Sequence, residues 1–263
     1  MQYQHQILIA SYAKDFHWLR QCLRSLTKFS TGFLPPVVAV PGADHELLCN
    51  LIADIPGCFA QPKVWNGEGF GRAQSAMMHG DILCGDAHYY WLLGSDCFAV
   101  EPFSPANYCD GEGKPYMLFN TWEFMQQHAK ETLFWRAGTE KALGLISHGE
   151  FMRRLPLAYP SDMMMGLRLH VERLHGLTFH DYVQREVNSY RNFSESNVMG
   201  EWAWRHCQGA YNWVNLDGDN HPTFKKWPAS PVTQFWSHGG IDRPRDGMTE
   251  TPRETIIKVL GSL

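Results

Sequence analysis

The first half of the chain alternates short apolar runs with segments whose apolar residues recur at helical spacing. The runs predict buried strands at residues 7–10, 37–40, 63–65 and 89–93. The helical spacing predicts helices between them, at residues 16–26, 47–52 and 73–83. Strands that alternate with helices indicate an α/β fold, in which a parallel sheet is covered by helices on both faces.

The second half has a less regular pattern. It predicts one strand at residues 116–119 and helices at residues 140–155, 163–175 and 196–207. Thr251 and Glu254 form a capping box around a proline, which predicts a last helix over the apolar positions that follow. Residues 217–231 are rich in Asp, Asn, Pro and Lys, and they predict a long surface loop.

The composition narrows the class of protein. With 44% hydrophobic residues and a net charge of −4, the chain is not disordered, and its 263 residues make one large domain or two small ones. No apolar run approaches the ~18 residues that a membrane span needs, and no secretory signal is visible, so we expect a cytoplasmic protein. Seven scattered cysteines without a Cys-x-x-Cys pair predict free thiols rather than a zinc site.

The strongest strand pattern runs directly into candidate chemistry. Residues 89–93 are followed by Gly94, Ser95 and Asp96. At the carboxyl end of a parallel strand, an aspartate lies where open α/β sheets bind ligands, and its oxygens suit a hard divalent cation. The pattern fits equally well an aspartate that closes a turn on its own backbone, so the residues alone leave both interpretations open.

At this segment the chain resembles metal-dependent glycosyltransferases of the GT-A type, which use nucleotide-sugar donors. In that superfamily an apolar strand ends in Asp-x-Asp; here Asp96 occupies the last position of the motif and Gly94 the first. Residues 193–204 are similar to the acceptor-side segment of a glycosyltransferase-like subgroup, and His238 matches a late histidine that is a metal ligand in many of these enzymes. The matching segments occur in the expected order, at residues 9–15, 67–74, 94–96, 193–204 and 236–238.

The resemblance implies one GT-A domain over residues 1–263, a Rossmann-like sheet with helices on both faces. Residues 1–110 would bind the nucleotide sugar, and residues 111–263, with irregular structure, would bind the acceptor. The implied cofactor is Mn²⁺ or Mg²⁺, held on the donor diphosphate by Asp96 and His238. The implied donor-binding residues are Ala10, Ser11, Tyr12, Asp15, Gly71, Arg72, Gln74, Gly94, Ser95 and Asp96.

Sugar transfer also needs charge neutralisation and, for inversion at the anomeric carbon, a base. A divalent cation neutralises the leaving diphosphate, and Arg72 could add a bidentate phosphate contact or be an ordinary surface arginine. Glu195 is the first candidate base because it precedes a predicted helix in the acceptor half; Asp162 is the second. Glu195 also fits a helix-start residue favoured by the helix dipole, and the residues alone slightly favour that interpretation. Candidates for an aromatic platform are Trp202, Trp204, Trp213, Trp227 and Trp236.

The leading hypothesis is therefore a hexosyl- or pentosyltransferase that uses a nucleotide sugar, with a UDP-sugar as the expected donor. Its acceptor could be a glycan, a small molecule or a hydroxymethylated pyrimidine in phage-type DNA. The mildly negative chain neither indicates nor excludes DNA, and basic pairs such as the one at Arg153 are interpreted as solvated surface.

Two other classes of function remain. Gly94, in place of the first acidic residue, motivates a non-catalytic nucleotide- or glycan-binding protein with a degenerate glycosyltransferase fold. A metal-dependent hydrolase using some of the thirteen histidines is disfavoured, because the sequence has no His-x-His or His-Glu-x-x-His arrangement.

Overall fold

A five-stranded sheet organises the computed structural model, which describes residues 3–67, 69–153, 155–187, 189, 191–218, 230–235, 240–244 and 249–262. The strand order is β3-β2-β1-β4-β8, parallel throughout except that β8 runs antiparallel to β4. The strands are β1 (His5–Ala10), β2 (Leu34–Val40), β3 (Gln61–Val64), β4 (Tyr89–Leu92) and β8 (Leu157–Pro160).

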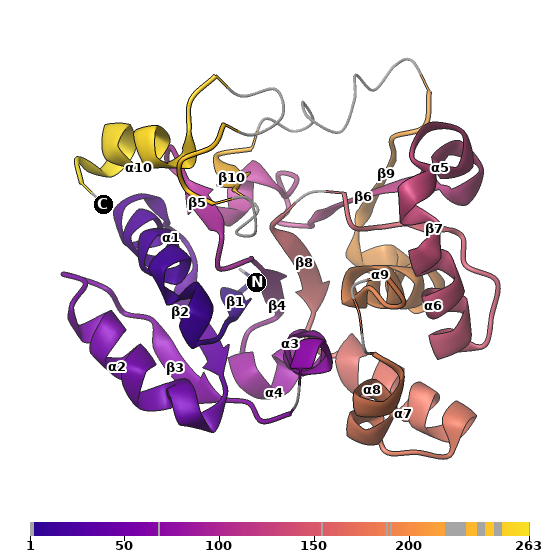
Figure 1. Ribbon diagram of the computed structural model, residues 1–263. Helices are drawn as coiled ribbons and strands as arrows, with labels where there is room; N and C mark the ends of the chain where they lie inside the picture. The colour runs from indigo at the N-terminus through magenta and orange to yellow at the C-terminus, as the bar shows by residue number, and fades with distance from the viewer. Residues whose placement is uncertain are drawn as a thin grey trace.

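Helices cover both faces of this sheet (Figure 1). One face carries α1 (Phe16–Phe29) and α2 (His45–Ala53), with α10 (Pro252–Leu260) beside α1. Helices of the other face are α3 (Gly69–Met77), α4 (Gly80–Cys84), α7 (Met163–His175), α8 (Phe179–Glu186) and α9 (Glu195–His206). None of the helices described is long and apolar enough to cross a membrane.

The alternation of side chains along the strands explains why both faces are buried. In β1, Ile7 and Ile9 pack toward α1 and α2, whereas Leu8 packs toward the other helices. In β4, Trp91 packs toward α1 and α2, and Tyr90 packs toward the helices of the other face. Because successive side chains of a strand point to opposite faces, a strand covered on both sides is apolar at every position.

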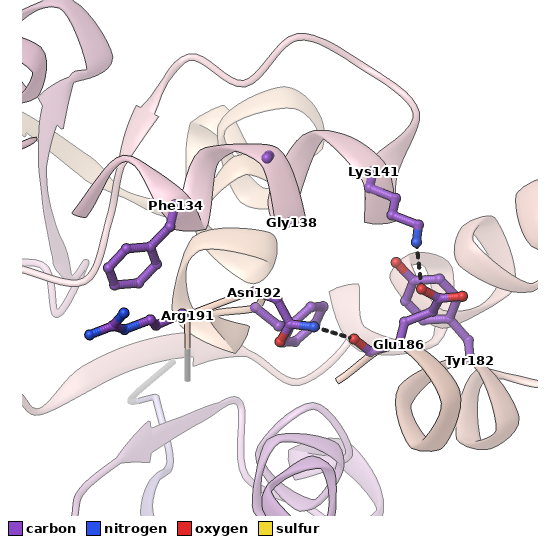
Figure 2. Close-up of a pocket in the computed structure, with 9 residues that line it drawn as sticks. Phe134, Gly138, Lys141, Tyr182, Glu186, Arg191 and Asn192 are labelled. Carbon is purple, nitrogen blue, oxygen red and sulfur yellow. Dashed lines mark hydrogen bonds and ion pairs between the residues drawn. The ribbon is translucent and has the colours of Figure 1, made fainter. Parts of the chain in front are cut away.

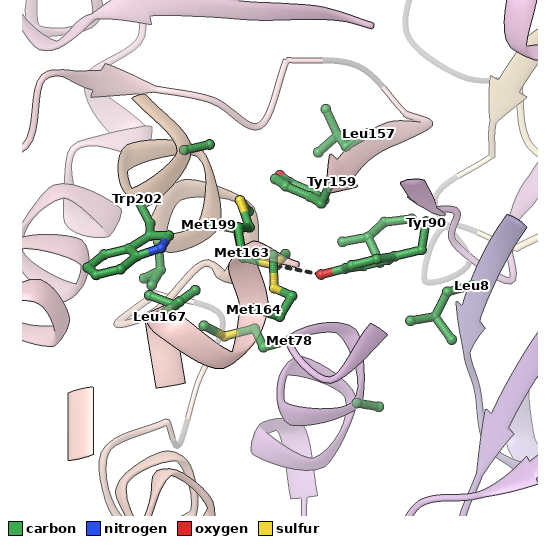
Figure 3. Close-up of a cluster of buried hydrophobic side chains, with 14 of the residues drawn as sticks. Leu8, Met78, Tyr90, Leu157, Tyr159, Met163, Met164, Leu167, Met199 and Trp202 are labelled. Atoms are coloured by element: carbon green, nitrogen blue, oxygen red, sulfur yellow. Dashed lines mark hydrogen bonds between the residues drawn. The ribbon is translucent and has the colours of Figure 1, made fainter. Parts of the chain in front are cut away.

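The core under α7 and α9 is rich in methionine (Figure 3). The Tyr90 hydroxyl donates to Met199 Sδ at 3.3 Å, so the buried phenol has a polar partner. Flexible thioether side chains fill irregular space between a sheet and crossing helices, which suits a core where several helices meet. The methionines of this core are Met78, Met117, Met163, Met164 and Met199.

Smaller elements complete the chain. A three-stranded sheet, order β7-β6-β9, is made of β6 (Tyr116–Thr121), β7 (Gly149–Glu150) and β9 (Asn212–Asn215). A two-stranded antiparallel sheet pairs β5 (Cys97–Ala99) with β10 (Val232–Gln234). The remaining helices are α5 (Trp122–His128) and α6 (Phe134–Leu143).

The sequence-based strands and helices of the first half are confirmed, with one exception. The helix predicted at 73–83 is two helices, α3 and α4, separated by a turn at Met78 and His79. In the second half the helices at 163–175 and 196–207 are confirmed, as is the capping box of Thr251 and Glu254.

The helix predicted at 140–155 is wrong beyond residue 143. Helix α6 ends where Gly144 adopts φ 65°, a left-handed conformation that costs glycine little. The chain then forms β7, whose partner β6 lies about 30 positions earlier, so the pairing leaves no local pattern. Of the loop predicted at 217–231, residues 219–229 lie outside the described part of the chain.

One close approach in this half yields a stability prediction. A Cβ added at Gly138 in α6 would lie 2.0 Å from the backbone oxygen of Asn192, which cannot rotate away. We expect Gly138→Ala to lower the free energy of unfolding by about 1–3 kcal/mol, as overpacking does. Gly209→Ala is the control, since nothing lies within 4 Å of its Cβ position. Equal unfolding midpoints for the two variants in urea would contradict the prediction.

Candidate functional site

The loop after β1 is fixed by its neighbours. Ser11 N donates to Ala39 O of β2 at 3.0 Å, and Ala13 N donates to Asp44 Oδ2 at 2.9 Å. Ser11 is 5% exposed, and its Oγ has no hydrogen-bond partner within the described residues. Since buried hydroxyls are normally satisfied, this oxygen suggests a ligand group or water at the end of β1.

Asp96 lies beyond the end of β4, which is the parallel neighbour of β1. A turn in which Cys97 N donates to Gly94 O places Asp96 at this edge of the sheet. Strand β10 comes alongside: Phe235 N donates to Asp96 O at 2.9 Å, and Gln234 Nε2 approaches Asp96 Oδ1 at 3.4 Å.

Two carboxylates follow neighbouring parallel strands at this edge, Asp15 in the segment after β1 and Asp96 after β4. Burial raises the pKa of the Asp15 carboxyl, the negative charge of Asp96 raises it further, and His17 opposes the rise. An anionic pair on adjacent strand ends favours a cation between or beside its members. Asp15 and Asp96, which the sequence analysis assigned to one site, lie at the same edge of the sheet, and the charge of Asp96 affects Asp15.

Gly94 makes room for the Asp96 side chain. A Cβ at position 94 would lie 2.6 Å from Asp96 Oδ1. Any side chain at the first position of the motif would therefore turn this carboxylate away from its present orientation. The glycine that departs from Asp-x-Asp is thus coupled sterically to the aspartate that remains.

This coupling predicts the effect of the smallest substitution. A cation held by Asp96 would lose affinity in Gly94→Ala, because the carboxylate is displaced; we expect Mn²⁺ to bind about tenfold or more weakly, a loss of about 1.4 kcal/mol. The measurement is a titration of Mn²⁺ at fixed nucleotide sugar. Gly111→Ala is the matched control, because its Cβ position is open. Unchanged Mn²⁺ dependence in the Gly94 variant would refute the coupling.

Helix α3 brings Arg72 to the loop after β1. The Arg72 guanidinium lies over the Tyr12 ring, 5.9 Å from its centroid. Burial raises the pKa of the Tyr12 hydroxyl, Asp15 raises it further, and Arg72 lowers it, so the three side chains sense one another. Gly71 allows α3 to pack closely on α8, because a Cβ there would lie 3.1 Å from Val187 O.

Gln74 and Glu195 meet behind this edge. Gln74 is 5% exposed, and its Oε1 accepts a hydrogen bond from Glu195 N at 3.0 Å. Glu195 begins α9 and is 8% exposed; Ser196 Oγ donates to its Oε1 at 3.1 Å. Burial raises the pKa of the Glu195 carboxyl, while hydrogen bonds from Ser196 and Gln74 lower it. Glu195 therefore lies next to α3, the helix that carries Arg72.

Asp162 is not brought to this edge. Because β8 runs antiparallel to β4, with Pro160 opposite Tyr89, the chain after β8 emerges at the amino-terminal end of β4. There Asp162 lines a separate pocket of about 570 Å³ together with Tyr3 and His88. The sheet lies between Asp162 and Asp96.

The remaining sequence-based candidates are placed as follows. His238, Trp227 and Trp236 lie outside the described residues. Trp202 packs in the methionine-rich core, and Trp204 stacks on His148 with ring centroids 4.3 Å apart. The described tryptophans of the predicted aromatic platform, Trp202, Trp204 and Trp213, therefore pack against other aromatic side chains.

A cluster of buried polar side chains supports the start of α9. Glu150 of β7 lies opposite Asn120 of β6 in the small sheet. It forms an ion pair with Arg153, which follows β7 by three residues. Asn197 Oδ1 accepts from Phe151 N at 2.6 Å. Burial lowers the pKa of Arg153 to about 9, against the opposing charge of Asp217. The sequence-based interpretation of Arg153 as solvated surface is wrong, because its charge is paired inside the protein.

A pocket of about 240 Å³ adjoins the segment that leads into α9 (Figure 2). Two of its walls are α6 and the end of α8, and Lys141 and Glu186 form an ion pair across it. Asn192 is held in its third wall, since its Nδ2 donates to Glu186 O at 2.6 Å. The lining residues include Phe134, Gly138, Lys141, Tyr182, Glu186, Arg191, Asn192 and Phe193.

Among the described residues, no group of three or more His, Cys, Asp and Glu side chains could hold a metal ion. The Asp96 carboxylate, with Asp15 near it, is a hard oxygen donor that fits Mn²⁺ or Mg²⁺. Mg²⁺ in particular is commonly bound by one or two carboxylates plus substrate phosphates and water. The residues present fit a metal that arrives with a diphosphate.

Sequence reasoning missed the side chains that hold the site in place. Asp44 fixes the loop after β1, Asn66 Oδ1 accepts from Gly42 N at 3.2 Å, and Gln234 reaches Asp96. Asp44 directly precedes α2, a position typical of an N-cap aspartate, so the sequence carried some signal for it. Nothing in the local sequence around Asn66 or Gln234 indicates a distant partner.

Comparisons with known proteins agree with this architecture. No protein-family model and no curated protein matches the sequence. Among solved structures, the chain is similar to the crystal structure of galactosyltransferase LgtC in complex with donor and acceptor sugar analogues. The two share 12% identity with a TM-score of 0.56, over 98% of this chain and 96% of that one. The mixed α/β architecture, with its mostly parallel sheet and its helices on both faces, is the GT-A glycosyltransferase fold.

Proposed function

We propose that the protein is a glycosyltransferase that moves a sugar from a nucleoside diphosphate to an acceptor hydroxyl. The observation that carries the proposal is the pair of carboxylates, Asp15 and Asp96, beyond the carboxyl ends of two adjacent parallel strands. This is the edge at which open α/β sheets bind nucleotides. The buried Ser11 hydroxyl in the loop after β1 supplies a polar group, and the Arg72 guanidinium of α3, which lies over Tyr12 of that loop, supplies a positive charge.

In this proposal the two halves of the chain bind different substrates. Residues 1–110 hold the donor: Ala10, Ser11 and Tyr12 contact the nucleoside, and Arg72 binds a phosphate. Residues 111–263 hold the acceptor, for which the pocket beside Asn192 is one available surface. The expected donor is a UDP-sugar.

Asp96 and His238 would hold a divalent cation, Mn²⁺ or Mg²⁺. Such a cation supplies Lewis-acid stabilisation of the departing diphosphate, worth several kcal/mol in the transition state. Phe235 contacts Asp96 through its backbone, and His238 follows it by only three positions. Three residues span at most about 10 Å, so chain length permits both side chains to share one ion.

Glu195 is the proposed base for an inverting transfer. The acceptor oxygen forms a bond to the anomeric carbon, the bond from that carbon to the diphosphate oxygen breaks, and the diphosphate leaves with the electron pair. The proton of the acceptor hydroxyl passes to a carboxylate oxygen of Glu195. A buried carboxyl with a raised pKa suits this task, because it holds a proton more firmly than an exposed one.

The test is release of nucleoside diphosphate from a panel of nucleotide sugars, with Mn²⁺ and without acceptor. We expect slow hydrolysis of at least one donor and faster release when its acceptor is added. Candidate acceptors are glycans, small hydroxyl compounds and DNA that contains hydroxymethylated pyrimidine. Absence of release with every donor would contradict catalysis.

A second function is favoured by Gly94. Without the first acidic residue, the edge of the sheet could bind a nucleotide or glycan without catalysing its reaction. The same panel separates the two functions, because a binding protein would bind a nucleotide sugar in calorimetry and release no nucleoside diphosphate.

A further inference from the structure

Strand β10 brings a glutamine to the Asp96 carboxylate. Gln234 Nε2 donates a long hydrogen bond to Asp96 Oδ1, at 3.4 Å, although the two residues are 138 positions apart in the chain. In the antiparallel pair of β10 and β5, Gln234 lies opposite Cys97, the residue that follows Asp96 (Figure 1). The pairing of these two strands therefore builds the contact.

The backbone that carries Gln234 is held in place by the next residue. Phe235 N donates to Asp96 O at 2.9 Å. The Phe235 side chain is 1% exposed, and its ring centroid lies 5.8 Å from that of Phe98 and 6.1 Å from that of Trp18. A polar group carried by a packed strand is held more precisely than one carried by a loop, so the Gln234 amide has a defined position beside Asp96.

Gln234 and Gly94 act on the same oxygen of Asp96. The Gln234 amide donates to Oδ1, and a Cβ at position 94 would lie 2.6 Å from that oxygen. The glycine leaves the space in which the carboxylate lies, and the glutamine supplies a hydrogen-bond donor there. An amide donor carries no charge, so it orients the carboxylate without neutralising it as a lysine or an arginine would.

We propose that Gln234 is a positioning residue of the cation site, whose amide holds the Asp96 carboxylate in the orientation that binds a divalent cation. Hydrogen bonds to a ligating carboxylate orient it, and the loss of such a partner typically weakens metal binding about 10–100-fold. The inference rests on the proposed function only in taking Asp96 as a ligand of the cation. The contact between Gln234 and Asp96 is independent of the donor, the acceptor and the base.

The experiment titrates Mn²⁺ alone into the protein at millimolar concentration. The electron paramagnetic resonance signal of free Mn²⁺ reports binding, so no turnover is needed. We expect Gln234→Leu to bind Mn²⁺ about tenfold more weakly than the wild type, because the carboxylate loses its hydrogen-bond donor. If the leucine variant fails to fold, Gln234→Met, which keeps the length of the side chain without its amide, replaces it.

The variant Gln234→Glu tests the same contact with an expected change of opposite sign. A second carboxylate beside Asp96 adds a negative charge and an oxygen ligand of the kind that Mn²⁺ prefers. We expect this variant to bind Mn²⁺ about tenfold more tightly than the wild type, since affinity rises with the number of charged ligands. A side chain that only stabilised the fold would not give weaker binding as leucine and tighter binding as glutamate.

The matched control is Thr233→Val. Thr233 precedes Gln234 on β10 and lies opposite Phe98, and successive side chains of a strand point to opposite faces, so this substitution should leave Mn²⁺ affinity unchanged. Equal Mn²⁺ affinity in the wild type and both folded Gln234 variants, weaker binding in both, or a wild type that binds no Mn²⁺ overturns the inference. Changes of opposite sign in a protein that releases no nucleoside diphosphate from any donor overturn the proposed function and leave the positioning role standing.

Discussion

Replacing Asp96 with alanine is expected to lower kcat/KM for the donor about 10²–10⁴-fold and to abolish its dependence on Mn²⁺. The reason is that the cation contributes several kcal/mol to stabilisation of the leaving diphosphate, and Asp96 is its one proposed ligand among the described residues. The fold should persist, because Asp96 lies beyond the end of β4 and its backbone bond to Phe235 does not need the side chain.

The control for this variant is Asp86→Ala. Asp86 is exposed in the turn before β4, at the opposite edge of the sheet, so the substitution removes the same charge without touching the proposed site. Wild-type Mn²⁺ dependence in Asp96→Ala, with circular dichroism and thermal midpoint unchanged, would remove Asp96 from the metal site.

Replacing Glu195 with glutamine is expected to lower kcat about 10²–10⁴-fold, the contribution typical of a general base. The same change should raise stability at pH values above the folded-state pKa of Glu195. Burial raises the folded-state pKa of Glu195, so the unfolded chain releases this proton at lower pH than the folded chain does. Wild-type stability therefore falls as pH rises from about 4.3, the unfolded value, through the folded value. Glutamine has no proton to release and avoids that loss.

The measurement is the thermal midpoint of both proteins from about pH 4, near the unfolded-state pKa, upward, alongside kcat. The wild-type midpoint should fall relative to that of the variant as pH rises. Glu112→Gln, on an exposed loop, is the control and should change neither quantity. Full activity in Glu195→Gln would remove the base from the mechanism; a retaining transfer would be one reaction consistent with that outcome.

The strands that frame the site were predictable because burial on both faces leaves a continuous apolar run. Residues 7–10, 37–40 and 89–93 show such runs, and they became β1, β2 and β4. Strand β8 was missed because it ends in Pro160 and follows Pro156, residues that argue against a strand, and because its antiparallel partner β4 lies far away in the chain.

The position of Asp96 was predictable from a general property of parallel sheets, and the meeting of Gln74 with Glu195 was not. The ends of parallel strands share one edge, so a residue after β1 and a residue after β4 must be neighbours. Gln74 and Glu195 are 121 residues apart, and no periodicity records which helices pack together. The same holds for Gln234 and Asp96, which are 138 residues apart.

Asp162 shows how one strand direction decides a site. If β8 ran parallel to β4, Asp162, which follows β8, would lie near Asp96 and could act on the same substrate. Because β8 is antiparallel, it lies at the opposite edge. The direction of a strand depends on its distant partner, so the sequence ranked Asp162 behind Glu195 as a candidate base but could not exclude it.

In the proposed function, the carboxylate of Asp96 binds a nucleotide sugar through a divalent cation. Isothermal titration calorimetry of the wild type with UDP-sugars and related donors, in Mn²⁺ and in EDTA, tests it most directly. We expect binding with a Kd below about 1 mM for at least one donor in Mn²⁺, and no detectable binding of that donor in EDTA or to Asp96→Ala. No binding of any nucleotide sugar at millimolar concentration, or equal affinity in Mn²⁺ and EDTA, would contradict it.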